Sequence, residues 1–259
     1  MEYQYIECSI RERVGYITLN RTDKRNALND VFVKELMHAV LLAEQTPEVK
    51  VVILNAKGSV FCAGADLEML QKMQAYSLEE NFHDSSALAE LFKLIYRSSK
   101  VYIAQIEGHA IAGGCGLATI CDFAFAVPEA KFGYTEVRIG FVPAIVMFFL
   151  IRKIGETRAK EMLLSGDLIS ATEAVQYHLI NKTIPADEIQ TKVFEFAQKL
   201  CTKNSEASMQ LTKKMIADIQ LFPIEEGLQF AAKMNAYARA TDDCKRGIAA
   251  FLNKEEIVW

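Results

Sequence analysis

The sequence has little of what marks a disulfide-bonded, metal-binding or membrane-spanning protein. Its 259 residues include six cysteines and four histidines, and no two cysteines stand in C-x-x-C spacing. Thiols scattered in this way are typical of reducing compartments, so we predict a cytoplasmic protein with no metal site. No apolar run reaches the roughly 20 residues of a membrane helix, and the first residues lack the apolar core of a signal peptide.

An excess of positive charge is also missing. The chain has 29 lysines and arginines against 33 aspartates and glutamates, which gives a net charge of −4. A wide nucleic-acid-binding face needs a basic field, so the composition predicts no nucleic-acid partner, and the lack of long apolar runs predicts no membrane partner. Hydrophobic residues make up 51% of the chain, which is enough to bury a large core.

Hydrophobic periodicity predicts an α/β protein that ends in helices. The predicted strands are 6–11 and 14–20, which form a hairpin, then 51–55, a strand beginning at Val60, 101–106, 123–127, 130–133 and 179–184. The predicted helices are 30–46, 67–75, 77–98, 114–121, 145–154, 157–165, 171–177, 187–202, 205–220, 224–239 and 242–253. Capping boxes at Ser77 and Ser170 mark two of the helix starts. Repeated ββα units of this kind predict a spiral of strands.

The stretch from Lys100 to Pro143 carries the first candidate site. A buried strand is followed by the pair Gly113-Gly114 and then by a helix. Backbone N–H groups at such a turn are unpaired, and the helix dipole favours an oxyanion beside them. Glycine pairs at these turns also occur for close packing alone, and the spacing is not the G-x-G-x-x-G of a dinucleotide site.

A second turn of the same kind lies upstream, and an acid lies downstream. Strand 51–55 leads to Phe61–Leu67, where Gly64 and Ala65 precede Asp66, a predicted helix cap. Two such turns can aim one N–H each at a single oxygen. Glu136 follows among aromatic neighbours, and a donor pair beside a half-buried carboxylate suits enolate stabilisation with proton transfer.

Four motifs, in this order and at these separations, carry a family resemblance. They are RTDKRNALN from residue 21, FCAGADL from 61, GHAIAGGCGLATICD from 108 and FGYTEVRIGFVP from 132. Over nearly its whole length the chain resembles the enoyl-CoA hydratase/isomerase (crotonase) superfamily. The resemblance implies a ββα-spiral core with an acyl-CoA site in residues 1–200. It also implies a helical region at 201–259 for assembly into a homotrimer or a dimer of trimers.

The resemblance also implies roles for individual residues. Oxyanion-hole N–H groups fall on Ala65 and Gly113, and the proton carrier falls on Glu136. Coenzyme A, which enters as part of the substrate with no tightly bound cofactor, is expected to meet Lys24, Arg25, Ala27, Ala63, Asp66, Leu67 and Lys254. The acyl pocket is expected to include Gly114, Gly116, Tyr134, Phe141 and Pro143.

One departure from the family pattern leaves the reaction open. Two-carboxylate hydratases carry a glutamate in a G-G-C-E-L pattern, and here that position is Gly116. This, with the segment from Ala144 to Phe149, resembles methylglutaconyl-CoA hydratase-like members of branched-chain and fatty acid catabolism. We predict hydration of an enoyl-CoA. The alternatives are a Δ3,Δ2-enoyl-CoA isomerase that uses one glutamate and a catalytically silent binding homologue.

Several further residues have possible roles. His109 is predicted to be structural, Asp122 to tether backbone, and Cys62 and Cys115 to face the pocket without a base partner. A dicarboxylic acyl chain could be met by Arg138, Arg152 or Lys153. If Glu136 does not carry the proton, the candidates are His83, Asp84 and Glu90.

Overall fold

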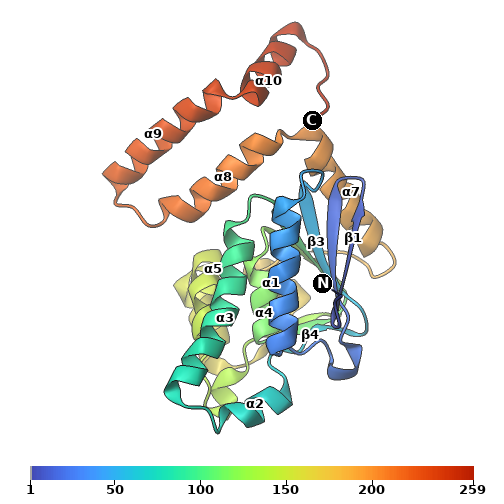
Figure 1. The fold of residues 1–259 in the computed structure, drawn as a ribbon, viewed down its shortest axis with the longest axis vertical. Coiled ribbons are helices and arrows are strands. Elements are labelled where there is room, and N and C mark those ends of the chain that lie inside the picture. The colour runs from blue at the N-terminus through green and yellow to red at the C-terminus, as the bar shows by residue number, and fades with distance from the viewer. Residues whose placement is uncertain (1) are drawn as a thin grey trace.

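The computed structural model describes residues 2–259, and most of its strands belong to one six-stranded sheet (Figure 1). The spatial order of the strands is β1-β2-β3-β5-β7-β10. Their bounds are β1 Ile6–Arg11, β2 Val14–Leu19, β3 Val51–Ala56, β5 Val101–Ile106, β7 Phe123–Ala126 and β10 Lys182–Thr183. The predicted hairpin is confirmed as the antiparallel pair β1–β2, and all other neighbours in this sheet are parallel. The strand predicted at 179–184 is only two residues long.

A second, four-stranded sheet has the order β4-β6-β8-β9. Its strands are β4 Val60–Cys62, β6 His109–Ile111, β8 Lys131–Gly133 and β9 Leu168–Ser170. The first three are parallel, and β9 is antiparallel to β8. We did not predict β6 and β9, because three residues are too few to show alternation.

The helices follow the predicted pattern closely. They are α1 Asp30–Gln45, α2 Leu67–Met73, α3 Leu78–Arg97, α4 Gly113–Ile120, α5 Ala144–Ser165, α6 Ala171–Gln176, α7 Ile189–Lys203, α8 Glu206–Ile219, α9 Ile224–Ala240 and α10 Asp242–Asn253, with 3-10 helices η1 Thr22–Lys24 and η2 Glu136–Ile139. Both predicted capping boxes are confirmed. α2 ends two residues earlier than predicted. The helices predicted at 145–154 and 157–165 are the two halves of α5, whose backbone is non-helical at Gly155.

The large sheet is covered on both sides. α1 packs against β1 and β2, whereas α7 crosses β2, β3, β5 and β7 on the opposite side (Figure 1). Every residue of β5 is buried, as are Val51 to Leu54 of β3. Continuous apolar runs of this kind belong to parallel strands with both faces covered. The α/β prediction is therefore confirmed.

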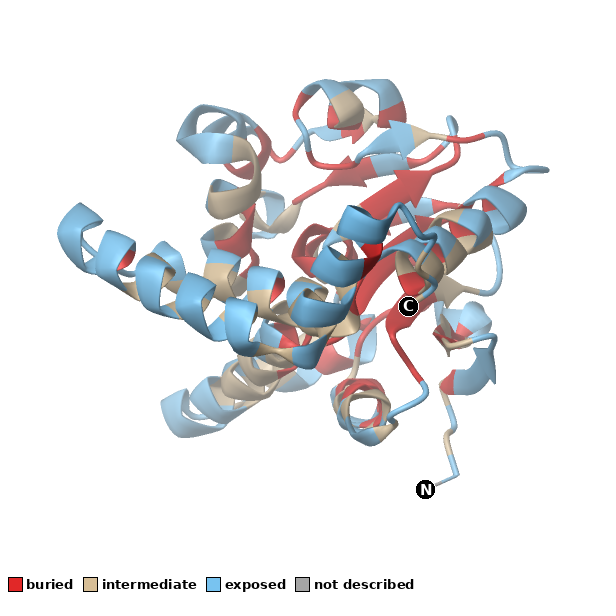
Figure 2. Ribbon diagram, turned by 90° about the horizontal axis from the view of Figure 1, so that it is seen from above, coloured by how far each residue is buried: buried red, intermediate tan, exposed pale blue. Residues whose placement is uncertain are grey.

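The C-terminal helices α8, α9 and α10 extend away from this body (Figure 1). Most of their surface is exposed (Figure 2), and Gly227 is the one buried residue of α9. Large apolar side chains on this arm face solvent, with Leu228 66% and Phe251 82% exposed. The sequence-based boundary after residue 200 falls inside α7, which packs on the sheet, and the projecting arm begins at α8.

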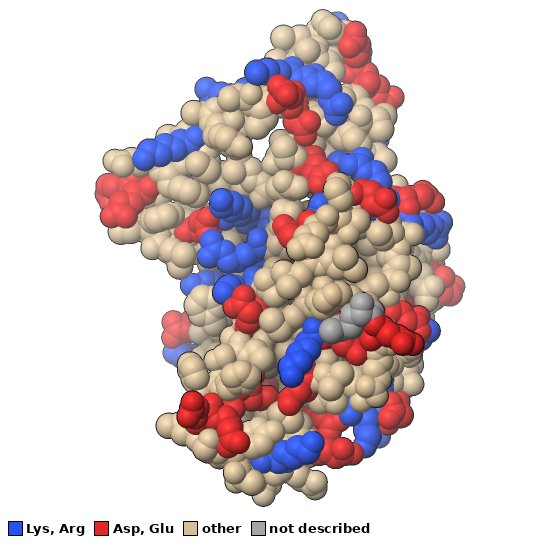
Figure 3. Space-filling model, viewed as in Figure 1, with Lys and Arg blue, Asp and Glu red and all other residues tan. Residues whose placement is uncertain are grey.

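The surface charge and the apolarity of the helices concern the two partner classes named in the sequence analysis, nucleic acids and membranes. In Figure 3, acidic and basic side chains are interspersed over the visible face, with no large field of one sign. Within residues 2–259, no helix combines the length and the apolarity needed to cross a membrane.

Candidate active site

Three neighbouring parallel strands bring the three principal candidate residues together. β4 pairs with β6 through Cys62 and Ala110, and β6 pairs with β8 through Ile111 and Gly133. Parallel strands end at the same edge of a sheet. Ala65, Gly113 and Glu136 each follow one of these strands within three residues, so the short sheet places them at one edge.

The first two turns touch each other. Gly64 has φ 90°, and a Cβ atom added there would lie 2.7 Å from Cβ of Ala112 and 3.5 Å from the backbone N of Gly113. Both the positive φ and the close approach therefore require glycine at position 64. Ala112 itself has φ 50°, a conformation that costs about 1–3 kcal/mol for a residue with a side chain. The strain lies immediately before Gly113.

The backbone pairing leaves N–H groups available at both turns. Leu28 donates to the Gly64 carbonyl at 2.7 Å and accepts from Asp66 at 2.9 Å, which is a parallel bridge around Ala65. In such a bridge the N–H of the central residue points away from the partner. Gly113 is the first residue of α4, so its N–H has no acceptor within the helix. The positive end of the helix dipole lies at the same place.

A cavity of about 630 Å³ opens over these turns. Among its lining residues are seven predicted ones, namely Ala63, Ala65, Leu67, Gly113, Glu136, Phe141 and Pro143. Most of the remaining wall is apolar and comes from α2, α3 and the segment that leads into α5. A mainly apolar cleft with a few convergent polar groups is typical of a small-molecule site.

Glu136 is the carboxylate that β8 brings to the edge of the small sheet where the two turns lie, and it lines the cavity. It begins η2, and its Oε2 atom is buried without a hydrogen-bond partner in residues 2–259. Burial raises the pKa of this carboxyl above its ordinary value of 4.5, and a backbone hydrogen bond offsets part of the shift. A carboxylate kept desolvated and unpartnered in a cleft suits proton transfer.

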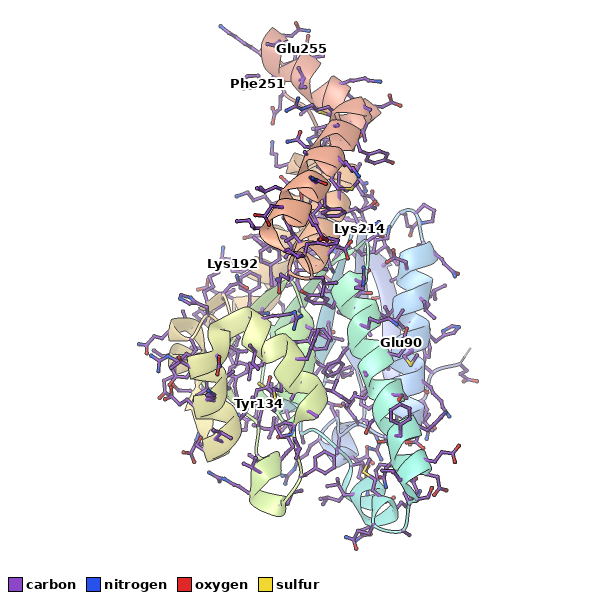
Figure 4. All side chains as sticks on the ribbon, turned by 90° about the vertical axis from the view of Figure 1, so that its left-hand side faces the viewer. Glu90, Tyr134, Lys192, Lys214, Phe251 and Glu255 are labelled. Atoms are coloured by element: carbon purple, nitrogen blue, oxygen red, sulfur yellow. The ribbon has the colours of Figure 1, made fainter. Side chains whose placement is uncertain are left out.

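Tyr134 and Gly114 lie behind the wall of the cavity, so their prediction as pocket residues is wrong. The Tyr134 hydroxyl lies 2.8 Å from Oγ1 of Thr119, inside the body of the protein (Figure 4). A Cβ atom added at Gly114 would lie 2.2 Å from the Cys62 carbonyl oxygen. The second glycine of the pair therefore serves close packing of α4 on β4, which was the alternative left open by the sequence.

Gly116 also does not face the cavity. A Cβ atom there would lie 2.5 Å from Cγ1 of Val146 and 2.7 Å from Cε2 of Phe92. The place where two-carboxylate hydratases carry a side chain is therefore filled by α3 and α5 rather than left open to substrate. The prediction of Gly116 as a pocket residue is wrong for this reason.

Lys24 and Arg25 lie on the exposed loop beside the cavity entrance. The Nζ atom of Lys24 is 2.7 Å from Oε1 of Glu68 on α2. The Ala63 N–H donates to the Arg25 carbonyl at 3.1 Å, which ties this loop to a residue of the cavity wall. Both cations are exposed and neither lines the cavity itself, so the structure places them on a loop that is tied to the cavity wall.

Ala27 and Asp66, predicted to contact coenzyme A, are buried beneath the loop and do not line the cavity. The Ala27 carbonyl accepts from Arg21 Nη1 at 2.7 Å, and Asp66 pairs with the same guanidinium. Asp66 also caps α2 by accepting from the Glu68 N–H at 2.7 Å, as predicted. The backbone carbonyl of Ala27 and the carboxylate of Asp66 hold the loop, so direct ligand contact by these residues was wrongly predicted.

Lys254 follows α10, at the far end of the arm. Phe251 and Glu255, on either side of it in sequence, lie there in Figure 4, well away from Tyr134. The prediction that Lys254 contacts coenzyme A therefore does not hold within one chain.

Arg138, Arg152 and Lys153, which were predicted as possible partners of a substrate carboxylate, contact other groups of the protein. Arg138 pairs with Asp167 on the surface. Arg152 lies over the Phe148 ring, with its Cζ atom 3.6 Å from the ring centroid. Lys153 is half-buried and donates to the carbonyls of Thr119 and Cys121, at 2.9 Å each. None of the three lines the cavity.

Two predictions of structural roles are confirmed, and one placement is wrong. His109 Nδ1 accepts from the Lys131 N–H at 3.2 Å, and Asp122 accepts from the Tyr102 N–H at 2.7 Å. Cys62 and Cys115 do not face the cavity. Both are fully buried, and burial raises the pKa of each thiol to about 12.

The sequence missed one wall of the cavity. Asp30 and Lys34 from α1 line it, together with His83 and Asp84 from α3. His83 and Asp84 had been named only as reserve proton carriers. The third reserve residue, Glu90, lies outside the cavity lining and pairs with Lys93.

A cavity that joins free backbone N–H groups to a desolvated carboxylate defines a class of enzyme site that stabilises oxyanions. Comparison with known protein families identifies which enzymes of this class the chain is related to. The family model described as enoyl-CoA hydratase/isomerase matches residues 9–259. The chain therefore belongs to the enoyl-CoA hydratase/isomerase family, within the crotonase superfamily.

Individual relatives agree with this assignment. A relative from Thermus thermophilus is 38% identical over 93% of this chain and 95% of its own length. The 2,3-dehydroadipyl-CoA hydratase of Escherichia coli is 32% identical over 95% of this chain and 94% of its own. The crystal structure of an enoyl-CoA hydratase from Bacillus anthracis matches with a TM-score of 0.91 and 30% identity, and covers 99% of both chains. These similarities confirm the crotonase fold.

Proposed function

We propose that this protein adds water to the double bond of an enoyl-CoA thioester. The observation that carries the proposal is the meeting of Ala65, Gly113 and Glu136 in one apolar cavity, with the buried Oε2 atom of Glu136 unpartnered. Family membership supplies the substrate class, because the matching model is described by this activity.

The proposed mechanism uses the backbone for charge and one side chain for protons. The thioester oxygen accepts hydrogen bonds from the N–H groups of Ala65 and Gly113. Ionised Glu136 takes a proton from water as the water oxygen bonds to the β-carbon, and the electron pair of the double bond moves toward the thioester oxygen. Glu136 then returns the proton to the α-carbon. Each donor is expected to contribute on the order of 3 kcal/mol to the transition state.

Coenzyme A enters as part of the substrate, and the mechanism uses no tightly bound cofactor. We place its phosphates near Lys24 and Arg25, since both are exposed beside the cavity and a mobile cation suits phosphate.

The assembly proposal concerns residues 201–259. Exposed apolar side chains on the arm support a homotrimer or a dimer of trimers, in which Lys254 reaches a neighbouring subunit's site. The cytoplasmic location remains part of the proposal, supported by the scattered free thiols.

Isomerisation is the second candidate function. Its support is that the space for a second carboxylate at position 116 is filled by Phe92 and Val146, which leaves Glu136 as the carboxylate that the motifs assign to the donor pair. One base that moves a proton across an allylic system is sufficient for that reaction. A methylglutaconyl-like acyl group is the narrower substrate hypothesis. A silent binding protein is disfavoured, since a binding site gains nothing from a desolvated, unpartnered carboxylate.

Mass spectrometry of products separates these possibilities. The purified protein is incubated with a panel of 2-enoyl-CoA and 3-enoyl-CoA thioesters, linear, branched and methylglutaconyl. Hydration adds the mass of one water to the product, whereas isomerisation changes retention on a column without a change in mass. Failure to convert any member of the panel contradicts both enzyme proposals.

A further inference from the structure

The cavity wall formed by α1 and the first half of α3 carries more acidic than basic side chains. This balance does not suit an acyl chain that ends in a carboxylate. Apart from Glu136 and the phenol of Tyr76, the ionisable lining residues are Asp30, Lys34, Glu80, His83 and Asp84. Three of the five are carboxylates, and no arginine lines the cavity. Lysine and arginine are the side chains that pair with a ligand carboxylate, and here one lysine stands against three acids.

These carboxylates lie on the side where an acyl chain must go. The thioester carbon is held over Ala65 and Gly113, and coenzyme A leaves toward Lys24. The acyl chain therefore extends the other way, between α3 and the segment that enters α5, where the apolar wall includes Leu88 and Val142.

Asp84 is the acid nearest to that path by helix geometry. On α3, Asp84, Leu88 and Phe92 are spaced four residues apart and share one face. Phe92 contacts the position of Gly116 in α4, and Leu88 and Asp84 line the cavity. Eight residues, or roughly 12 Å along the helix axis, separate Asp84 from Phe92. Asp84 and an acyl chain in this cavity therefore share partly desolvated surroundings, in which charges are screened less than in bulk solvent.

The carboxylate of Asp84 is partly buried and is not paired with a cation within residues 2–259. The pKa of its carboxyl is raised first by burial and next by the carboxylate of Asp30, and His83 lowers it by a smaller amount. No side-chain hydrogen bond or ion pair within residues 2–259 engages Asp84, whereas Glu80 is held by its capping box at Ser77. An anionic group that arrived here would meet two carboxylates in partly desolvated surroundings.

We propose that the acyl group accepted by this cavity is uncharged, and that Asp84, together with Asp30, rejects acyl chains that end in a carboxylate. This inference rests on the proposed function, because it takes the cavity to be the acyl site. It separates this protein from the methylglutaconyl-like hypothesis and from relatives that are named for dicarboxylic substrates. Substrates are linear or branched hydrocarbon acyl chains.

The test compares two ligands that differ at one end only. Hexanoyl-CoA and adipoyl-CoA share six acyl carbons, and the terminal methyl of the first is a carboxylate in the second. Isothermal titration with the full-length protein measures both affinities. The expected result is that adipoyl-CoA binds at least about ten-fold more weakly. The affinity ratio is expected to shrink several-fold in Asp84→Asn, which keeps the shape and removes the charge.

A matched control is available on the same helix. Glu90→Gln removes a carboxylate that lies outside the cavity lining, and it is expected to leave the ratio unchanged. Equal affinities in the wild type, tighter binding of adipoyl-CoA, or a ratio unaffected by Asp84→Asn each overturn the inference. The proposed function is judged separately by turnover of trans-2-hexenoyl-CoA, because the binding comparison needs no reaction.

Discussion

The ring of Phe92 occupies the space that a side chain at position 116 would need. Its Cε2 atom lies 2.7 Å from where a Cβ atom of residue 116 would stand, and Cγ1 of Val146 lies closer still, at 2.5 Å. Side chains of α3 and α5 therefore fill the space around Gly116 in which two-carboxylate hydratases carry their second glutamate.

This packing predicts that Gly116→Glu destabilises the protein rather than restoring a second catalytic acid. Even Gly116→Ala is expected to cost about 1–3 kcal/mol of unfolding free energy, because a methyl group already overlaps two side chains. Urea denaturation measures the loss. Phe92→Ala alone is expected to cost about 3–5 kcal/mol, because Phe92 is fully buried. In that background the further cost of Gly116→Ala should be smaller than in the wild type, since one of the two clashes is gone. An alanine variant as stable as the wild type contradicts the overlap.

The raised pKa of Glu136 has a consequence for stability. Burial holds the folded-state pKa above the ordinary value of 4.5, so the folded protein keeps this proton to higher pH than the unfolded chain. The associated stabilisation is fully present below the unfolded pKa and is lost as pH rises through the folded pKa. Glu136→Gln carries no charge at any pH, so its melting temperature should exceed that of the wild type at pH 7.

The difference in melting temperature between Glu136→Gln and the wild type is expected to depend on pH. The advantage of Glu136→Gln should shrink as pH falls to about 4, where the wild-type carboxyl is protonated as well. Glu90→Gln, a change on the partly exposed part of α3, serves as the control. A Gln variant that is less stable than the wild type at pH 7 would show that the carboxylate has partners not seen in this structure.

The contact between Lys24 and Glu68 gives a prediction for coenzyme A. Replacing both Lys24 and Arg25 by alanine should raise KM several-fold with a much smaller change in kcat, because phosphate contacts are equal in the ground and transition states. Glu68→Gln releases Lys24 from its present partner and should lower KM. Steady-state kinetics at two salt concentrations checks both changes. An unchanged KM in the double variant would move the phosphate site elsewhere.

Gly113→Val tests the donor at the start of α4. The new Cβ atom would lie 3.3 Å from Cδ1 of Leu28, a contact that a small shift relieves, so the fold is expected to persist. The side chain would stand between the backbone N–H and the thioester oxygen. We expect kcat to fall by about 10²–10³-fold, with a circular dichroism spectrum like that of the wild type. Near-normal turnover by a folded variant would remove Gly113 from the mechanism.

Much of this architecture is readable from sequence, for reasons visible in particular elements. β5 is a run of six residues in which only Gln105 is polar, and α3 begins with a capping box. Local patterns therefore identify both elements. The turns at Gly64 and at the pair Gly113-Gly114 are signalled by glycine itself, because close approach leaves no room for a side chain at Gly64 or Gly114. The role of Glu136 was predicted from the family resemblance of the motif that begins at Phe132.

The remainder depends on contacts between distant segments. The neighbours of Gly116 come from α3 and α5, and no local pattern indicates that Phe92 and Val146 meet there. β6 and β9 owe their existence to pairing with β8, since three residues have no strand signal of their own. Tyr134 was expected to face the pocket because it stands beside Glu136, but its hydroxyl is bonded to Thr119 behind the wall.

The central claim is that Glu136 carries the proton in hydration, with no second carboxylate at the donor pair. Its most direct test is the rate of water addition to trans-2-hexenoyl-CoA by wild-type protein and by Glu136→Gln under saturating substrate. We expect a measurable wild-type kcat, a loss of about 10²–10⁴-fold in the variant, and nearly unchanged KM. A variant that retains wild-type kcat would contradict it.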